Sequence, residues 1–165
     1  MGPIALEALV DRIPDGALLA AIPDYSNVPM AATRALIRRG AKELRLLAVP
    51  TGGFQTDLLI GAGCVAEIEA AAVGLGEYGS APRFTEALRS GAIRMRDATC
   101  PAIHAGLQAS EKGVPFMALR GIIGSDLLGQ RADWRVIENP YGERDPIVLV
   151  PARQPDIALF HAATV

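Results

Sequence analysis

Aromatic residues and cysteines are scarce in this chain of 165 residues. Aromatic side chains make up only 5% of the sequence, although 50% of the residues are hydrophobic. The core must therefore be built from Ala, Leu, Ile and Val, which favours helices lying close on a sheet. The two cysteines, Cys64 and Cys100, belong to no CxxC pair and have no histidine at ligand spacing. We expect reduced thiols, a cytoplasmic protein and no metal site.

Charge of one sign and long apolar runs are also missing. The 16 basic and 18 acidic residues are interspersed and give a net charge of −2, which argues against a nucleic-acid-binding surface. No apolar run reaches the roughly 18 residues of a membrane span, and the N-terminus lacks the pattern of a signal peptide. The expected partners are small molecules or proteins, with no nucleic acid and no membrane.

Several motifs of well-known sites are absent from the sequence. GxGxxG and GxxxxGK[ST] do not occur, so a Rossmann dinucleotide site and a P-loop are not predicted. HExxH and GxSxG are missing as well, which argues against zinc catalysis and a serine hydrolase elbow. His104 and His161 are interpreted as structural. No tightly bound cofactor is expected.

Apolar runs alternate with stretches that carry helix start and stop signals. The predicted strands cover 17–22, 43–49, 66–75, 114–119, 147–152 and 156–162. The predicted helices cover 4–13, 29–40, 56–63, 85–91 and 101–113, and 120–130 is expected to be a loop. This order predicts a single α/β domain over 1–165, with an open, mostly parallel sheet and helices on both faces.

Ligands of such a sheet bind outside the carboxyl ends of its strands. The candidate binding loops are 23–29, 50–55, 76–84 and 120–126. Gly52 and Gly53 would let the backbone approach a phosphate or carboxylate at the start of a helix. Glu77 could serve as a base or nucleophile, or be an ordinary solvated glutamate. Arg120 could bind an anion bidentately, or pair with Asp126 instead.

Three groups of segments occur in a distinctive order along the chain. DLLIGAG is followed by GLGEYGSAP, GVPF leads to RGIIGSD, and PDIALFHA closes the sequence. In this order they resemble the A subunits of class I coenzyme A transferases of the glutaconate type, over nearly the whole chain. The resemblance implies an open α/β/α fold, a partner B subunit, and exchange of CoA between an acyl thioester and a carboxylic acid.

The resemblance also implies how the catalytic groups are divided. The nucleophilic glutamate is expected in the B subunit of a heterodimer or heterotetramer, so this chain is not expected to be active alone. Glu77 is the one candidate catalytic residue here. The candidate residues for binding the substrate or CoA are Ser26, Asn27, Gly52, Gly53, Phe54, Gly79, Arg120 and Ser125.

Departures from the family pattern leave two alternatives open. Ring-opening relatives that hydrolyse a carbon–carbon bond carry a glutamate before the GLQA helix, whereas 96–101 here reads RDATCP, with only Asp97 as a substitute. The first loop, 23–29, has no glycine to supply oxyanion N–H groups, although Ser26 or Asn27 could donate from side chains. The chain is also shorter than family members. The alternatives are therefore a hydrolase component and a catalytically silent scaffold subunit.

Overall fold

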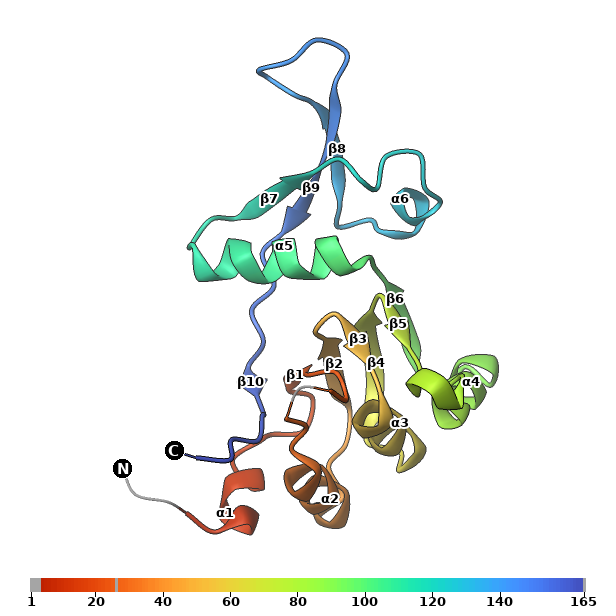
Figure 1. Ribbon diagram of the computed structural model, residues 1–165, viewed down its shortest axis with the longest axis vertical. Coiled ribbons are helices and arrows are strands. Elements are labelled where there is room, and N and C mark those ends of the chain that lie inside the picture. The colour runs from red at the N-terminus through yellow and green to blue at the C-terminus, as the bar shows by residue number, and fades with distance from the viewer. Residues whose placement is uncertain (1–3, 26, 165) are drawn as a thin grey trace.

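Strands and helices alternate from the N-terminal part of the chain up to α5 (Figure 1). The computed structural model describes residues 4–25 and 27–164. The central sheet has the strand order β10-β1-β2-β4-β6, and all neighbouring strands in it are parallel. Its strands are β1 (Leu18–Ala21), β2 (Leu44–Ala48), β4 (Val65–Ala70), β6 (Arg94–Asp97) and β10 (Ile157–Ala158). The helices of this part are α1 (Leu6–Val10), α2 (Met30–Arg39), α3 (Phe54–Gly61) and α4 (Pro82–Arg89).

The helix boundaries follow from local signals in the sequence. Arg38 and Arg39 lie in the last turn of α2, and Gly40 ends that helix with a left-handed φ of 76°. In α5 (Cys100–Glu111) the hydroxyl of Thr99 accepts the backbone N–H of Ala102 at 3.3 Å. Pro101 lies in the first turn of α5, where its missing N–H costs nothing.

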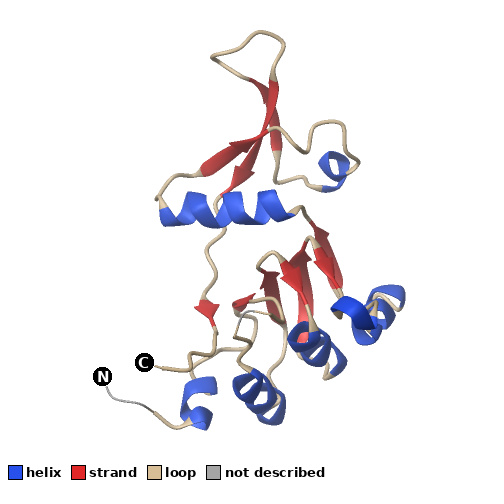
Figure 2. Ribbon diagram, viewed as in Figure 1, coloured by secondary structure: helices blue, strands red, loops and turns tan. Residues whose placement is uncertain are grey.

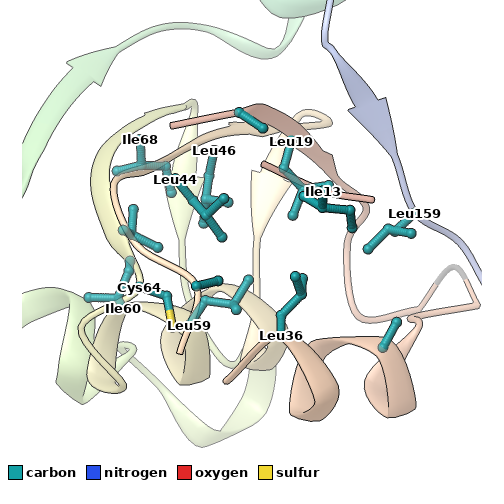
Figure 3. Packing of buried hydrophobic residues seen from close by; sticks show 14 of the residues in the cluster. Ile13, Leu19, Leu36, Leu44, Leu46, Leu59, Ile60, Cys64, Ile68 and Leu159 are labelled. Carbon is teal, nitrogen blue, oxygen red and sulfur yellow. The ribbon is translucent and has the colours of Figure 1, made fainter. Parts of the chain in front are cut away.

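One face of the central sheet is apolar and is covered by the helices α1 to α4. Leu19, Leu46 and Ile68 project from three neighbouring strands into this layer (Figure 3). They belong to the same buried cluster as Leu36 of α2 and Leu59 of α3. All five side chains are at most 1% exposed, so this layer is the main hydrophobic core.

The opposite face of the sheet is covered by α5. Leu18 of β1 and Leu47 of β2 join a second buried cluster with Ala102 and Ile103 of α5. The prediction of a mostly parallel sheet with helices on both faces is therefore confirmed.

A second, antiparallel sheet lies beyond α5 and was not predicted (Figure 2). It has the order β7-β9-β8, from β7 (Phe116–Leu119), β8 (Arg135–Glu138) and β9 (Pro146–Pro151). Val148 and Val150 of β9 pack toward α5 in the second cluster. The expected loop 120–130 contains a short helix, α6 (Leu127–Gln130).

The C-terminal strand is shorter than predicted. Only Ile157 and Ala158 of the expected strand 156–162 pair with β1, and Phe160 beyond them is 69% exposed. The expected strand 66–75 is likewise split into β4 and the two-residue β5 (Ala72–Val73). No helix within the described residues is long and apolar enough to span a membrane.

Candidate active site

A cavity of about 740 Å³ opens at the carboxyl ends of β1, β2 and β4. Three loops line it. The first contributes Pro23, Asp24 and Tyr25, the second Thr51, Gly52, Gly53 and Phe54, and the third Ala72, Gly74, Leu75, Gly76 and Tyr78. Three of the four candidate loops thus meet at one site, as expected for a parallel sheet.

A short two-stranded sheet joins the second loop to the third. In β3 (Thr51–Gly52) both residues pair in parallel with β5, and the N–H of Gly74 donates to the carbonyl of Gly52 at 3.1 Å. A Cβ at Gly52 would lie 2.9 Å from the hydroxyl oxygen of Thr56 in α3. Glycine at this position therefore lets the loop pack directly on the helix that follows it.

Asp24 of the first loop reaches across to the start of α3. The backbone N–H of Phe54 donates to Oδ2 of Asp24 at an N–O distance of 2.6 Å. A Cβ at Gly53 would collide with the same carboxylate. The carboxylate therefore rests directly on the glycine loop, where an N-terminal helix N–H is available to an anion.

Aromatic side chains are concentrated at this cavity. Tyr25, Phe54 and Tyr78 line it, and they are three of the eight aromatic residues in the chain. Their exposed fractions are 82%, 48% and 91%, so large apolar surfaces are available to a ligand.

The predicted site residues of the second loop lie at the cavity. Gly52, Gly53 and Phe54 all line it. Glu77 lies in the 3-10 helix η1 (Gly76–Tyr78), between two lining residues, and its side chain is exposed. The structure thus leaves Glu77 at the rim of the cavity.

Asn27 and Gly79 support the neighbouring loops and do not line the cavity. Asn27 has a φ of 52°, and its carbonyl accepts the N–H of His161 at 2.8 Å, which ties the segment after β10 to the first loop. The carbonyl of Gly79 accepts the N–H of Leu75 at 2.8 Å and closes the turn around η1. Ser26 lies outside the described residues.

Arg120 and Ser125 do not line the cavity. Nε of Arg120 donates to Oδ1 of Asp145 at 2.8 Å, so the expected alternative partner Asp126 is wrong. Hydrogen bonds from Arg120 and Asn139 hold the pKa of Asp145 well below its usual range. The hydroxyl of Ser125 donates to the carbonyl of Ile122 at 2.8 Å and stabilises its own loop.

Asp97, the substitute for the glutamate of ring-opening relatives, also lies away from this cavity. It ends β6 and lines a separate cavity of about 480 Å³ together with Arg131 and Asp133. Its carbonyl accepts Nη1 of Arg131 at 2.9 Å. No carboxylate takes its place among the described residues that line the larger cavity, apart from Asp24.

A buried ion-pair network on the second face of the sheet was missed. Nη2 of Arg131 donates to Oε1 of Glu69 at 2.7 Å, and Nη2 of Arg153 lies 2.6 Å from Oε2. Glu69 and Arg131 are each 4% exposed, and the guanidinium of Arg131 stacks 4.3 Å above the ring of Trp134. Burial works against the charge of Arg131, but hydrogen bonds to Asp133 and the nearby Glu69 raise its pKa overall.

A signal for this network was present in the sequence. Glu67 and Glu69 alternate with apolar residues in β4, and Arg94 and Arg96 alternate in β6. The two strands pair in the register that puts Glu67 opposite Arg94 and Glu69 opposite Arg96. Opposite charges in register on neighbouring strands indicate ion pairs between the strands, and a glutamate on a covered face of the sheet needs such a partner.

Comparison with known proteins shows which proteins the chain is related to, which the geometry of the cavity does not show. No family model matches the chain. The chain is 30% identical over 164 residues to the A subunit of 3-oxoadipate CoA-transferase from Pseudomonas knackmussii, in an alignment that covers 96% of this chain and 57% of that protein. The chain is homologous to the A subunits of CoA-transferases. This confirms the family resemblance of the sequence.

Two further relatives have different activities. The A subunit of glutaconate CoA-transferase from Acidaminococcus fermentans is 28% identical over 150 residues, 81% of this chain and 47% of that protein. The cholesterol ring-cleaving hydrolase IpdA subunit of Rhodococcus jostii is 32% identical over 145 residues, 81% of this chain and 46% of that protein. This A-subunit homologue thus spans about half the length of these curated relatives.

Solved structures agree with the fold. Glutaconate coenzyme A-transferase of A. fermentans superimposes with a TM-score of 0.87 at 22% identity, over 96% of this chain and 56% of that chain. A variant of the decarboxylase AibA/AibB gives a TM-score of 0.85 at 28% identity, over 96% and 61% of the two chains. The open α/β architecture of this A-subunit homologue is therefore that of the CoA-transferases.

Proposed function

We propose that this chain is an A-type subunit of a cytoplasmic CoA-transferase, which moves coenzyme A between an acyl-CoA and a carboxylic acid. The observation that carries the proposal is the homology to a CoA-transferase A subunit over 96% of the chain. The cavity at the carboxyl ends of β1, β2 and β4 supports it, because Gly52 and Gly53 line that cavity. The CoA thioester is the substrate, and no tightly bound cofactor is needed.

The partner in this proposal is a B-type subunit that supplies the nucleophile, in a heterodimer or heterotetramer. A glutamate of the partner attacks the thioester carbonyl, releases the CoA thiolate and forms an acyl anhydride. The thiolate then attacks the glutamyl carbonyl of the anhydride, which gives an enzyme–CoA thioester and frees the first acid. Asp24 is the one carboxylate among the described cavity-lining residues, and it is engaged by the N–H of Phe54. This chain alone is therefore expected to be inactive.

The residues of this chain would bind and orient the acyl-CoA. Gly52 and Gly53 would let the ligand approach the backbone, and Phe54 would contact its apolar part. Glu77 is retained as a catalytic candidate at the rim, beside Tyr78. Ser26, Asn27, Gly79, Arg120 and Ser125 remain candidate binding residues on the basis of the sequence. Asn27, Gly79, Arg120 and Ser125 do not line the cavity.

A catalytically silent subunit is the second candidate, and Asp24 favours it. A carboxylate that already rests on the glycine loop and on the N–H of Phe54 opposes a developing oxyanion there. A hydrolase subunit would differ from both in turning over acyl-CoA without an acceptor acid. Acyl-CoA titration and acceptor dependence therefore separate the three functions.

Co-purification from the native source, with mass spectrometry of the eluted proteins, is the test. The same fraction is assayed for exchange of CoA between an acyl-CoA and a free carboxylic acid. A stoichiometric B-type subunit with acceptor-dependent exchange is the expected result. A self-associated chain that neither exchanges nor binds CoA would contradict the transferase proposal and favour the silent subunit.

A further inference from the structure

Among the described residues, the cavity lacks the cationic side chains expected of a site that binds a carboxylate. Its described lining contains one charged side chain, the carboxylate of Asp24, and no arginine, lysine or histidine. The rest of the lining is aromatic, aliphatic or glycine, apart from Thr51, with Tyr25, Phe54 and Tyr78 presenting the largest surfaces. The 740 Å³ cavity is also large enough to take an acyl chain of several carbons.

The substrates named for two relatives carry a charge that this cavity does not match. 3-Oxoadipate and glutaconate are dicarboxylic acids, so each keeps a free carboxylate after its other end has become a CoA thioester. A carboxylate removed from water needs a cation or several N–H donors to replace its hydration. Here it would approach the like charge of Asp24, and the nearby N–H of Phe54 already donates to that side chain.

The position of Asp24 is fixed by the backbone around it. The N–H of Phe54 holds one carboxylate oxygen at 2.6 Å, and Gly53 leaves room for the carboxylate to lie flat on the loop. A carboxylate held in this way stays at the cavity wall when a ligand enters. An uncharged acyl chain loses little in this setting and gains contact with the three aromatic side chains.

On this basis, and on the proposed function, we infer that the site selects an uncharged, apolar acyl group in its CoA thioester. Asp24 disfavours dicarboxylic acyl groups of the kind named for the relatives. The selective group is a side chain of the first loop, whereas most of the apolar contacts come from the second and third loops. Charge and apolar surface can therefore be altered separately.

Isothermal titration of the chain with three ligands tests the inference. The ligands are free coenzyme A, hexanoyl-CoA and adipoyl-CoA, and the two thioesters have acyl groups of equal length that differ by one terminal carboxylate. Hexanoyl-CoA is expected to bind at least about tenfold more tightly than adipoyl-CoA. Asp24→Asn keeps the acceptor for the N–H of Phe54 and should narrow this gap by tightening adipoyl-CoA binding.

Matched variants separate the apolar contacts from the general state of the protein. Tyr78→Ala should weaken the binding of hexanoyl-CoA by about tenfold and leave the dissociation constant of free coenzyme A unchanged. Tyr141 is 97% exposed and outside the cavity, so Tyr141→Ala is its control, and Asp11→Asn on the surface after α1 is the control for Asp24→Asn.

Each outcome has a distinct meaning. Equal binding of the two thioesters, or tighter binding of adipoyl-CoA, would overturn the inferred selectivity and leave the proposed function intact. A gap that Asp24→Asn does not narrow would overturn the role of this carboxylate. No binding of any of the three ligands would instead overturn the proposed function.

Discussion

The two faces of the central sheet are built on opposite principles. Leu46 and Ile68 face α1 to α4 and pack without any polar partner. On the face toward α5, Leu47 of β2 packs in the second apolar cluster, but Glu69 of β4 is a buried carboxylate that pairs with Arg131 and Arg153. The layer toward α1 to α4 tolerates any apolar side chain of suitable volume. The face toward α5 instead needs a cation to pair with each buried carboxylate.

The charged face depends on residues that arrive late in the sequence. Arg131 follows α6, and Arg153 follows β9, yet both meet the carboxylate of Glu69. A buried ion pair contributes little net stability, because desolvation offsets most of the attraction. Its loss is costly when only one partner is removed, since the other charge stays buried. The ion pairs of this network therefore form only when the segments that carry Arg131 and Arg153 pack against β4 in the native arrangement.

The largest effect on this comparison is expected from Glu69→Gln. Arg131 would keep its 4% exposure but lose a buried carboxylate, which we expect to lower the free energy of unfolding by about 3–5 kcal/mol. Urea unfolding measures this change. Glu67→Gln is the matched control, because its partner Arg94 is 76% exposed and its loss should cost no more than about 1 kcal/mol. Equal losses of unfolding free energy in Glu69→Gln and Glu67→Gln would contradict the distinction between a buried and an exposed partner.

The apolar face is tested by Leu46→Ala. Leu46 is 1% exposed in the main core, and the cavity left behind should cost about 3 kcal/mol. Leu46→Met keeps the volume and should cost less than about 1.5 kcal/mol. Urea unfolding of both variants checks this tolerance. If Leu46→Met lowers the free energy of unfolding as much as Leu46→Ala does, the apolar face also requires one particular side chain and the comparison fails.

Acid should weaken the charged face before the apolar one. Burial would raise the pKa of Asp133, but hydrogen bonds from Arg131 and the charges of Arg131 and Arg96 lower it overall. Its folded-state pKa is below its unfolded value, so its stabilisation is complete above a pH of about 4 and is lost as the pH falls through the folded value. Asp133→Asn should cost about 1 kcal/mol at neutral pH.

Thermal unfolding at pH 7 and pH 3 measures this linkage. The fall in Tm between the two values should be smaller in Asp133→Asn than in the wild-type protein. Asp11→Asn, on the surface after α1, is the control variant. An equal fall in Asp133→Asn and the wild-type protein would show that Asp133 does not couple stability to pH.

The sequence predicts the apolar face far better than the rest. Leu19, Leu46 and Ile68 lie in apolar runs whose length and spacing indicate strands, and local stop signals such as Gly40 bound the helices. β8 was missed because all four of its residues are exposed, so it has no buried face to produce a pattern. A short exposed strand of this kind forms because it pairs with a neighbouring strand, here β9, and not because of its own sequence pattern.

The site was predicted where sequence and topology agree. Gly53 follows a parallel strand, so its loop was expected at the carboxyl edge of the sheet, and the loop lies there and lines the cavity. Arg120 also follows a strand, but β7 belongs to the antiparallel sheet, whose strand ends do not share that edge. Asp24 was missed as a site residue because its bond to the N–H of Phe54 joins residues 30 positions apart. No local pattern encodes such a contact.

Gly53→Val should have a small effect on stability and a large effect on ligand binding. The new Cβ would displace the Asp24 carboxylate from the loop, and the lost hydrogen bond from Phe54 should cost about 1 kcal/mol. The valine side chain would then occupy the place where a ligand approaches the backbone. Thermal unfolding and hexanoyl-CoA titration measure the two effects. Gly129→Val is the control, because its Cβ would meet nothing within 4 Å. Equal losses of stability and binding in Gly53→Val would mean that the glycine loop serves the packing of the sheet and not the ligand.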